Sequence, residues 1–307
     1  YSWDGGNLTF SLEHFREKMI YQRDIPRMSD PMAFGVFTYS GYPASALVLD
    51  GPLQNLLLTD PRCPSDLGES EAFPKAYRWN WYEREPGSDW LFEASCGYNY
   101  AVDSSFSPEY KRNSLLLDGH QELGSQIRLV ARVLYTDSEA DDVWAPAALE
   151  DDYLIYGADN PVNPLWLYIG RTVTDPGLLA FGIPDGTWEF SEDDLADVWV
   201  TMRTVPSGNR TFTSDHENTS IYAGLEGAQA WLGGTQWELG LEWARSHVRD
   251  TSRNLTNLKA LQELMDSGAL DLFNVQGLDH DTWMANSTAA FAAANHTSLY
   301  FGDTDMW

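Results

Sequence analysis

The sequence is poor in lysine and in basic residues as a whole. It contains four lysines, and its 19 basic residues stand against 46 acidic ones, which gives a formal net charge of -27. Such a surface repels nucleic-acid phosphates and anionic lipid headgroups. We therefore expect no nucleic-acid partner and no peripheral binding to anionic membranes.

Long apolar runs are also missing. No stretch approaches the ~18 apolar residues that a membrane-spanning helix needs. The sequence starts at Tyr1 without an initiator methionine or an apolar leader. Either a signal peptide has been removed or the sequence is a piece of a longer chain. We expect a soluble protein that is secreted or exposed at the extracellular face of the cell surface.

Cysteine is scarce, with Cys63 and Cys96 as the two examples. Their spacing matches neither a paired zinc site nor a Cys-x-x-Cys redox motif. One pair fits one disulfide in an oxidising compartment, and the alternative is two buried thiols. A disulfide closing a loop of this length would stabilise the fold by about 3–4 kcal/mol on the chain-entropy model.

The familiar signatures of catalysis and cofactor binding are absent from the sequence. No two histidines are spaced i, i+4, and there is no His-Glu-x-x-His, no Gly-x-Ser-x-Gly and no phosphate-binding glycine loop. The acidic clusters at 137–142, 150–152 and 192–194 lack the spacing of a helix–loop–helix calcium loop and are typical of solvated loops. We predict no metal and no cofactor, and no residue is assigned a catalytic role.

Glycosylation sequons, in contrast, are abundant. Six of the 14 asparagines begin an Asn-x-Ser/Thr triplet, whereas ordinary serine and threonine usage predicts about two. Five of the six follow residue 205, and two lie in the polar stretch 209–220. This excess indicates N-glycosylation in the secretory pathway. The predicted sites are Asn7, Asn209, Asn218, Asn254, Asn286 and Asn295.

The hydrophobic pattern changes twice along the chain. Three-and-four spacing after Ser11 predicts a helix over 11–23. Short runs rich in β-branched and aromatic residues, broken by Gly, Pro, Asp and Asn, predict many strands from about 33 to 205. From about residue 221 the spacing favours helices, at 230–248, 257–273 and 281–301. The predicted fold class is α+β, with a mainly antiparallel sandwich or barrel-like body, an N-terminal helix and a helical C-terminal portion.

This pattern divides the chain into a strand-rich body at 1–210 and a helical, glycosylated portion at 211–307. We expect the two to pack together as one unit. Many strands with few intervening helices favour an antiparallel core over a parallel one.

Two aromatic segments are candidate sugar sites. In a strand over 77–84, Tyr77, Trp79 and Trp81 would share one face, which makes them a possible ligand-binding strip or one side of a core. The segment 231–243 combines three tryptophans with Glu238 and Glu242, and aromatic platforms with paired carboxylates are what a glycosidase uses. On a helical wheel, however, both glutamates fall in a polar stripe with Arg245, which favours the solvated face of a packed helix.

Two hypotheses for function follow. The first is a secreted or cell-surface N-glycosylated protein with a recognition or structural role, which would bind a protein partner, its own copies or glycans. The alternative is an extracellular carbohydrate-active hydrolase or lyase that uses acidic side chains, suggested by 13 Trp, 15 Tyr and 46 carboxylates.

Overall fold

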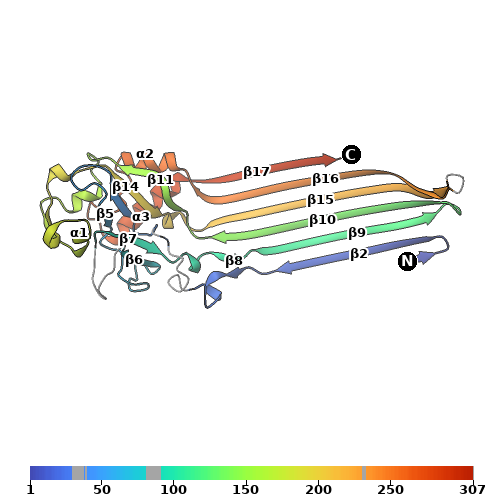
Figure 1. Cartoon of the computed structure of the whole chain (residues 1–307), viewed down its shortest axis with the longest axis horizontal. Coiled ribbons are helices and arrows are strands. Elements are labelled where there is room, and N and C mark those ends of the chain that lie inside the picture. The colour runs from blue at the N-terminus through green and yellow to red at the C-terminus, as the bar shows by residue number, and fades with distance from the viewer. Residues whose placement is uncertain (30–37, 39, 81–90, 230–232, 307) are drawn as a thin grey trace.

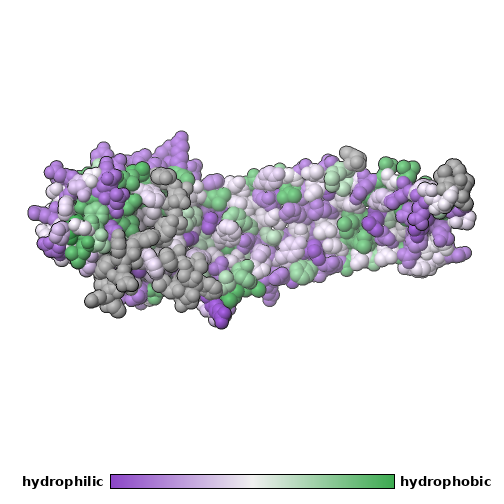
Figure 2. Space-filling model, viewed as in Figure 1, coloured by the Kyte–Doolittle hydropathy of each residue, from purple (hydrophilic) through white to green (hydrophobic). Residues whose placement is uncertain are grey.

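The protein has a head and a long β-sheet that extends from it (Figure 1). The computed structural model describes residues 1–29, 38, 40–80, 91–229 and 233–306. Strands make up 50% of the structure and helices 17%. In the space-filling view the sheet is a long, narrow extension on which hydrophilic and hydrophobic residues are interspersed (Figure 2).

The long sheet has seven antiparallel strands in the order β1-β2-β9-β10-β15-β16-β17. At about 3.3 Å per residue, the 22-residue strand β16 spans about 70 Å. The strands are β1 (Ser2–Trp3), β2 (Gly6–Glu17), β9 (Glu109–Glu122), β10 (Ile127–Trp144), β15 (Arg210–Gln229), β16 (Thr235–Thr256) and β17 (Asn295–Met306).

Alternation of residue types explains why these segments form strands. In β16 the large apolar residues Trp237, Leu239, Leu241 and Trp243 occupy every second position, which places them on one face of a strand. The tight β9–β10 connection passes through Gly124, whose φ of 141° suits glycine better than any other residue.

The head contains one four-stranded sheet, three two-stranded sheets and three α-helices among the described residues. The four-stranded sheet has the order β11-β14-β4-β5, and the pairs are β12-β13, β3-β8 and β6-β7. The strands are β3 (Ile20–Tyr21), β4 (Ser45–Val48), β5 (Leu57–Thr59), β6 (Ala76–Asn80), β7 (Ala94–Tyr98), β8 (Ser105–Ser107), β11 (Ala148–Tyr156), β12 (Thr172–Thr174), β13 (Thr187–Glu189) and β14 (Val198–Arg203).

The helices of the head are short and capped by side chains. The α-helices are α1 (Pro176–Ala180), α2 (Leu258–Asp266) and α3 (His280–Ala294). Asp175, Asn257 and Asp279 accept backbone N–H bonds at their first turns, as N-cap residues do. The 3₁₀-helices are Gln22–Asp24, Tyr100–Val102, Pro164–Leu167, Pro184–Gly186, Glu192–Asp194 and Val205–Ser207.

The hydrophobic core lies entirely in the head. One cluster combines residues of the four-stranded sheet with residues of α1, α2 and α3, and a smaller one surrounds Cys63, Cys96 and Trp283. Within the described residues, none of the buried hydrophobic side chains belongs to the seven strands of the long sheet. The long sheet is therefore a single layer without a core of its own.

The predicted α+β class is wrong, because the protein is more nearly all-β. The expected N-terminal helix over 11–23 falls largely in strand β2, whose residues pair with β9 along its whole length. The expected helix over 230–248 falls largely in strand β16. The helical wheel therefore does not describe the positions of Glu238 and Glu242. Among the described residues, α2 and α3 lie where α-helices were predicted, but the predicted helix at 281–301 continues from residue 295 as strand β17. The boundary predicted at residue 210 coincides with the start of β15, and segments from both sides of it pair in the long sheet.

Several strands of the body were predicted correctly, including those that contain β4, β7, β10 and β14. Two segments of the predicted strand-rich region are different. The segment 164–173 begins as a 3₁₀-helix, and the segment 178–183 overlaps α1. In both places an Asn or Asp cap followed by proline starts a helical turn. The Asp-Gly pair at 118–119, a turn signal in the sequence, lies inside β9.

Candidate interaction surface

One face of the long sheet carries an exposed apolar patch. In an antiparallel sheet, residues directly opposite each other point to the same face. The register therefore places on one face, far from the head, a set of mostly large apolar residues from five neighbouring strands. This apolar patch consists of Leu8, Phe10, Leu12, Leu115, Leu117, Leu129, Ala131, Val133, Tyr135, Ile221, Ala223, Leu225, Trp237, Leu239, Leu241 and Trp243.

The patch is open to solvent. Leu241 is 84% exposed, Leu239 71%, Leu12 69% and Phe10 57%. The sixteen residues, each occupying about 4.8 Å by 6.8 Å of the sheet, give a footprint of roughly 500 Å². The largest apolar patch on a monomeric protein is of about this size and often marks an interaction site.

Nearer the head, the same face changes to charged residues. Lys111 contacts Glu139 at 2.6 Å, and both His247 and Arg245 contact Asp303, at 2.5 and 3.6 Å. His247 is the main cause that lowers the pKa of Asp303. This charged belt consists of His14, Arg16, Lys111, Asp137, Glu139, Asp215, Glu217, Arg245, His247, Arg249 and Asp303. The boundary between patch and belt lies within one row of residues.

The opposite face of the sheet is mainly polar, although Phe15, Leu134, Tyr300 and Met306 are exposed on it. Cross-strand ion pairs join Arg112 to Glu13, Arg128 to Glu226 and Arg132 to Asp118. Each such exposed pair contributes little to stability, about 0–1 kcal/mol, but together they make this face well suited to water. We name it the polar face.

Both sequons within β2 and β15 lie on the polar face. Asn7 is opposite His120, and Asn218 is opposite Thr136. Both positions alternate with residues of the apolar patch along their strands, so their side chains point the other way. Asn218 and Asn286, on α3, are exposed. None of the six predicted sites belongs to the apolar patch.

The other three sequon asparagines meet where the sheet joins the head, which we name the neck. Asn254 donates from Nδ2 to the backbone oxygen of Asn209 at 2.7 Å, and Asn295 donates to that of Ser207 at 3.5 Å. Asn254 has a φ of 58° and lies where the register between β16 and β17 shifts. Such a bulge allows a local change in strand direction.

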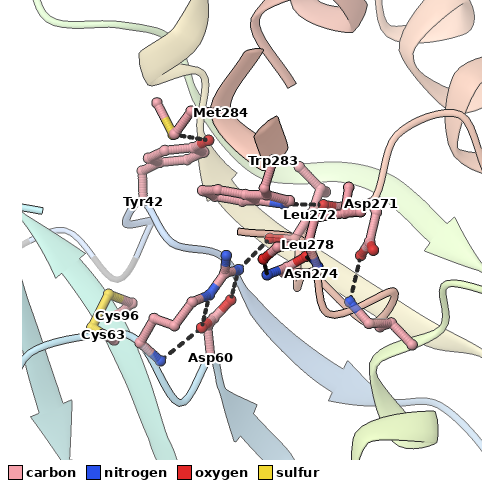
Figure 3. Close-up of polar contacts among 12 residues, drawn as sticks. Tyr42, Asp60, Cys63, Cys96, Asp271, Leu272, Asn274, Leu278, Trp283 and Met284 are labelled. Carbon is pink, nitrogen blue, oxygen red and sulfur yellow. Dashed lines mark hydrogen bonds and ion pairs between the residues drawn. A yellow bond between two sulfur atoms is a disulfide. The ribbon is translucent and has the colours of Figure 1, made fainter. Parts of the chain in front are cut away.

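The predicted disulfide is confirmed, with Cys63 and Cys96 joined and their Cα atoms 5.9 Å apart. It lies close to a polar network in the head (Figure 3). Arg62 donates to the buried carboxylate of Asp60 at 2.9 and 2.5 Å, and its guanidinium lies 3.9 Å from the ring centre of Trp283. Trp283 donates to the backbone oxygen of Asp271.

This network has the properties of a structural anchor. Asp60 has no exposed surface, and burial raises its pKa while the hydrogen bonds from Arg62 oppose that rise. Burial also raises the pKa of Asp271, although its carboxylate caps Val275 and Gln276. Because both carboxylates are buried and bonded, they fix loops to the head and are not presented to a substrate.

The structure describes only part of the predicted aromatic strip. Tyr77 is 4% exposed, and burial raises its pKa to about 12. Trp79 is half-buried, and Trp81 lies outside the described residues. A ligand-binding role for Tyr77, Trp79 and Trp81 stays a prediction. In the other aromatic segment, Glu238 and Glu242 lie on the polar face, and Trp237 and Trp243 lie in the apolar patch.

Two open hollows could receive small ligands. One, of about 680 Å³, lies at the far tip of the sheet, where Glu226 pairs with Arg128 and Glu238 accepts a hydrogen bond from Tyr222. The other, of about 480 Å³, lies at the neck beside Trp144, Arg203 and Arg210. The side chain of Arg210 stacks on Trp144 and donates to Ala145.

Neither metal ligation nor membrane crossing by a helix finds support among the residues that the structure describes. In those residues, no three His, Cys, Asp or Glu side chains gather in a metal-binding arrangement. No helix there is both long and apolar enough to cross a bilayer. No family model matches the chain, and neither a curated protein nor a solved structure is significantly similar to it. The geometry of the chain itself therefore carries the functional argument.

Proposed function

We propose that this chain is a secreted or cell-surface N-glycosylated protein with a recognition or structural role, and that its long sheet binds a macromolecular partner through the apolar patch. The observation that carries this proposal is the asymmetry of the sheet. One face exposes an apolar patch, and the other carries ion pairs and the sequon residues Asn7 and Asn218.

The energetics of the sheet favour a partner. Sheets normally bury at least one apolar face against another layer. Covering roughly 500 Å² of apolar surface at ~25 cal/mol per Å² would contribute on the order of 10 kcal/mol before the entropic cost of association. A glycan on the polar face would leave this patch accessible, because the two faces point in opposite directions.

The compartment is supported by two independent features. The disulfide between Cys63 and Cys96 persists in oxidising environments, which include the secretory pathway and the cell exterior. The six sequons are substrates of the same pathway. The acidic net charge keeps such a protein soluble in spite of an exposed apolar patch.

The test is expression behind a signal peptide in a eukaryotic secretory host. We expect recovery from the medium with glycans attached and no free thiol. The purified protein is then incubated with a panel of polysaccharides, and both retention and cleavage products are measured. Recovery without glycans would contradict the glycoprotein assignment. Cleavage of a polysaccharide would overturn the non-enzymatic role and favour the hydrolase or lyase alternative.

A further inference from the structure

We infer that the occupant of the apolar patch is a second copy of this chain, packed face to face on the first with the two heads at opposite ends. The inference rests on the proposed function only in taking the patch as an interaction surface. It adds the identity of the partner, the orientation and the contacts.

The area of the patch suits a stable dimer. A standard protein interface buries about 800 Å² of accessible surface on each partner. The flat footprint of the patch is roughly 500 Å², and side chains of leucine and tryptophan corrugate it, so its accessible area is larger. One sheet of the same width, at the usual separation of about 10 Å, covers it.

Side-chain size varies from row to row in a way that matches a second copy. On the three central strands, the row of Gly119, Ala131 and Ala223 has the smallest side chains of this face, and Leu8 and Leu241 close the row at its two ends. The next row toward the head is formed on the same strands by the larger Leu117, Val133 and Ile221. The patch therefore has a shallow groove beside a ridge across its three central strands.

A two-fold axis brings the groove and the ridge together. An axis that runs across the strands, midway between these two rows, places the ridge of each copy over the groove of the other. Leu117 then lies over Gly119, and Val133 over Ala131. Such a two-fold contact is self-complementary, as a symmetric dimer requires.

Charge selects this orientation over the parallel one. If both heads lay at the same end, the charged belts would overlap and the acidic residues Asp137 and Glu217 of one copy would face those of the other. In the antiparallel arrangement, the same axis places Asp137 and Glu217 over Ile127 and Gly227 at the tip of the other copy, so the acidic residues of the two belts do not face each other. The two heads are then separated by much more than the ~8 Å over which charges act in physiological salt, which matters for two chains of net charge -27.

The sequons are compatible with this dimer. Asn7 and Asn218 lie on the polar face, which points away from the second copy. The neck asparagines Asn209, Asn254 and Asn295 lie beyond the patch, at the junction with the head. Glycosylation can therefore be complete before the dimer forms.

The first test measures the mass of the glycosylated full chain by sedimentation over a range of concentrations. We expect a dimer in the wild type and at least tenfold weaker association in Leu241→Glu, which places a charge in the patch. The matched control is Ala244→Glu, which adds the same charge on the same strand but on the polar face. It should associate as the wild type does.

The second test checks the orientation. Both native cysteines are in the disulfide, so introduced thiols report only on the interface. Chains carrying Ala131→Cys are mixed with chains carrying Val133→Cys under mild oxidation. The antiparallel dimer predicts a cross-linked pair formed faster than in either variant alone. Equal rates, or no cross-link in a dimer, would overturn the proposed axis.

A monomeric wild type at high micromolar concentration would overturn self-association itself. If the wild type is monomeric, its binding to neutral phosphatidylcholine vesicles is measured next. Binding that is lost in Leu241→Glu would show that the patch binds lipid. In that case the second copy is excluded while the patch remains an interaction surface. The proposed function fails if the protein carries no glycans or cleaves a polysaccharide. Neither result is measured by sedimentation, cross-linking or vesicle binding, so the two failures are distinguishable.

Discussion

Asn254 donates its side-chain amide to the backbone oxygen of Asn209 at 2.7 Å, although the two residues are 45 positions apart. Both residues begin a sequon. The bond joins the entry to β15 with the end of β16, at the neck. Asn254 also has a positive φ of 58°. The residue therefore adopts a left-handed backbone conformation at the position where its side chain makes a long-range contact.

We predict that Asn254→Ala lowers the free energy of unfolding by about 1–3 kcal/mol. Alanine loses the hydrogen bond and tolerates positive φ poorly, whereas asparagine adopts it more readily. Asn254→Gly should lose less, because glycine accepts this backbone conformation. Urea denaturation measures both. Thr256→Val is the control, since it removes the sequon and leaves Asn254 in place. Equal losses in Ala and Gly would exclude backbone strain as a cause.

The occupancy of the sequons should follow their exposure. Asn218 and Asn286 are exposed, whereas Asn254 is half-buried and its amide nitrogen already donates to Asn209. We expect nearly complete glycosylation at the first two and low occupancy at Asn254. Enzymatic deglycosylation in ¹⁸O-water followed by peptide mass spectrometry measures each site. The reverse order of occupancy would show that glycans are attached before the neck folds.

Removal of Arg62 should destabilise the head strongly. In Arg62→Ala the carboxylate of Asp60 stays buried and loses its charged partner, which typically costs about 3–5 kcal/mol. Adding Asp60→Asn to Arg62→Ala should recover part of that loss, because the uncompensated charge disappears. The exposed Arg171 offers a matched control, and Arg171→Ala should change stability little. Chemical denaturation of all four proteins gives the comparison.

Stability should increase as the pH falls from neutral toward 5. Burial raises the pKa of Glu93, 8% exposed in the head, and of Asp60, Asp175 and Asp271. A carboxyl whose folded pKa is raised binds its proton more tightly in the folded state. Its contribution is complete below the unfolded pKa of about 4 and is lost as pH rises through the folded value.

The variant Glu93→Gln isolates one of these groups. Its amide oxygen can accept the Leu57 backbone N–H as the carboxylate does. We expect higher stability than the wild type at neutral pH and a smaller change between pH 5 and 7 in thermal melts. An unchanged slope would assign the pH dependence to the other buried carboxylates.

The sequence predicted the local features of the head well. Helices α2 and α3 lie in segments predicted to be helical, and residues that cap helices are visible as Asn257 and Asp279. The disulfide followed from counting. These features depend on residues close in sequence or on a unique pairing, so local rules suffice.

Strands β2 and β16 of the long sheet were mispredicted as helices because their sequences fit both a helical and a strand periodicity. Leu12, Phe15 and Met19 fit a helix, but Leu8, Phe10 and Leu12 fit a strand, and pairing with β9 decides between them. Likewise Trp237, Leu239, Leu241 and Trp243 alternate at every second position, a signal that was present in the sequence. Pairing partners lie as far apart as Asn7 and His120.

The apolar patch could not be predicted for a different reason. Alternation shows which side of a strand is apolar, but an apolar side is normally expected to be buried in a core. Whether a second layer covers it depends on the whole fold. The polar-face position of Asn7 could have been found, because the apolar Leu8 and Phe10 follow it at alternating positions, whereas Asn218 lies between Glu217 and Thr219 and offers no such signal.

The length of β16 separates the two ends of the molecule. At about 70 Å, the tip lies roughly nine screening lengths from the head at physiological ionic strength. Charges at one end therefore exert almost no electrostatic force on a ligand bound at the other end of the same chain. A change of pH, a bound ion or a substituted residue in the head can act on the tip only through the backbone ladder. The long sheet thus separates two ends of the molecule, and charged residues at one end can be substituted without an electrostatic effect on the other end of the same chain.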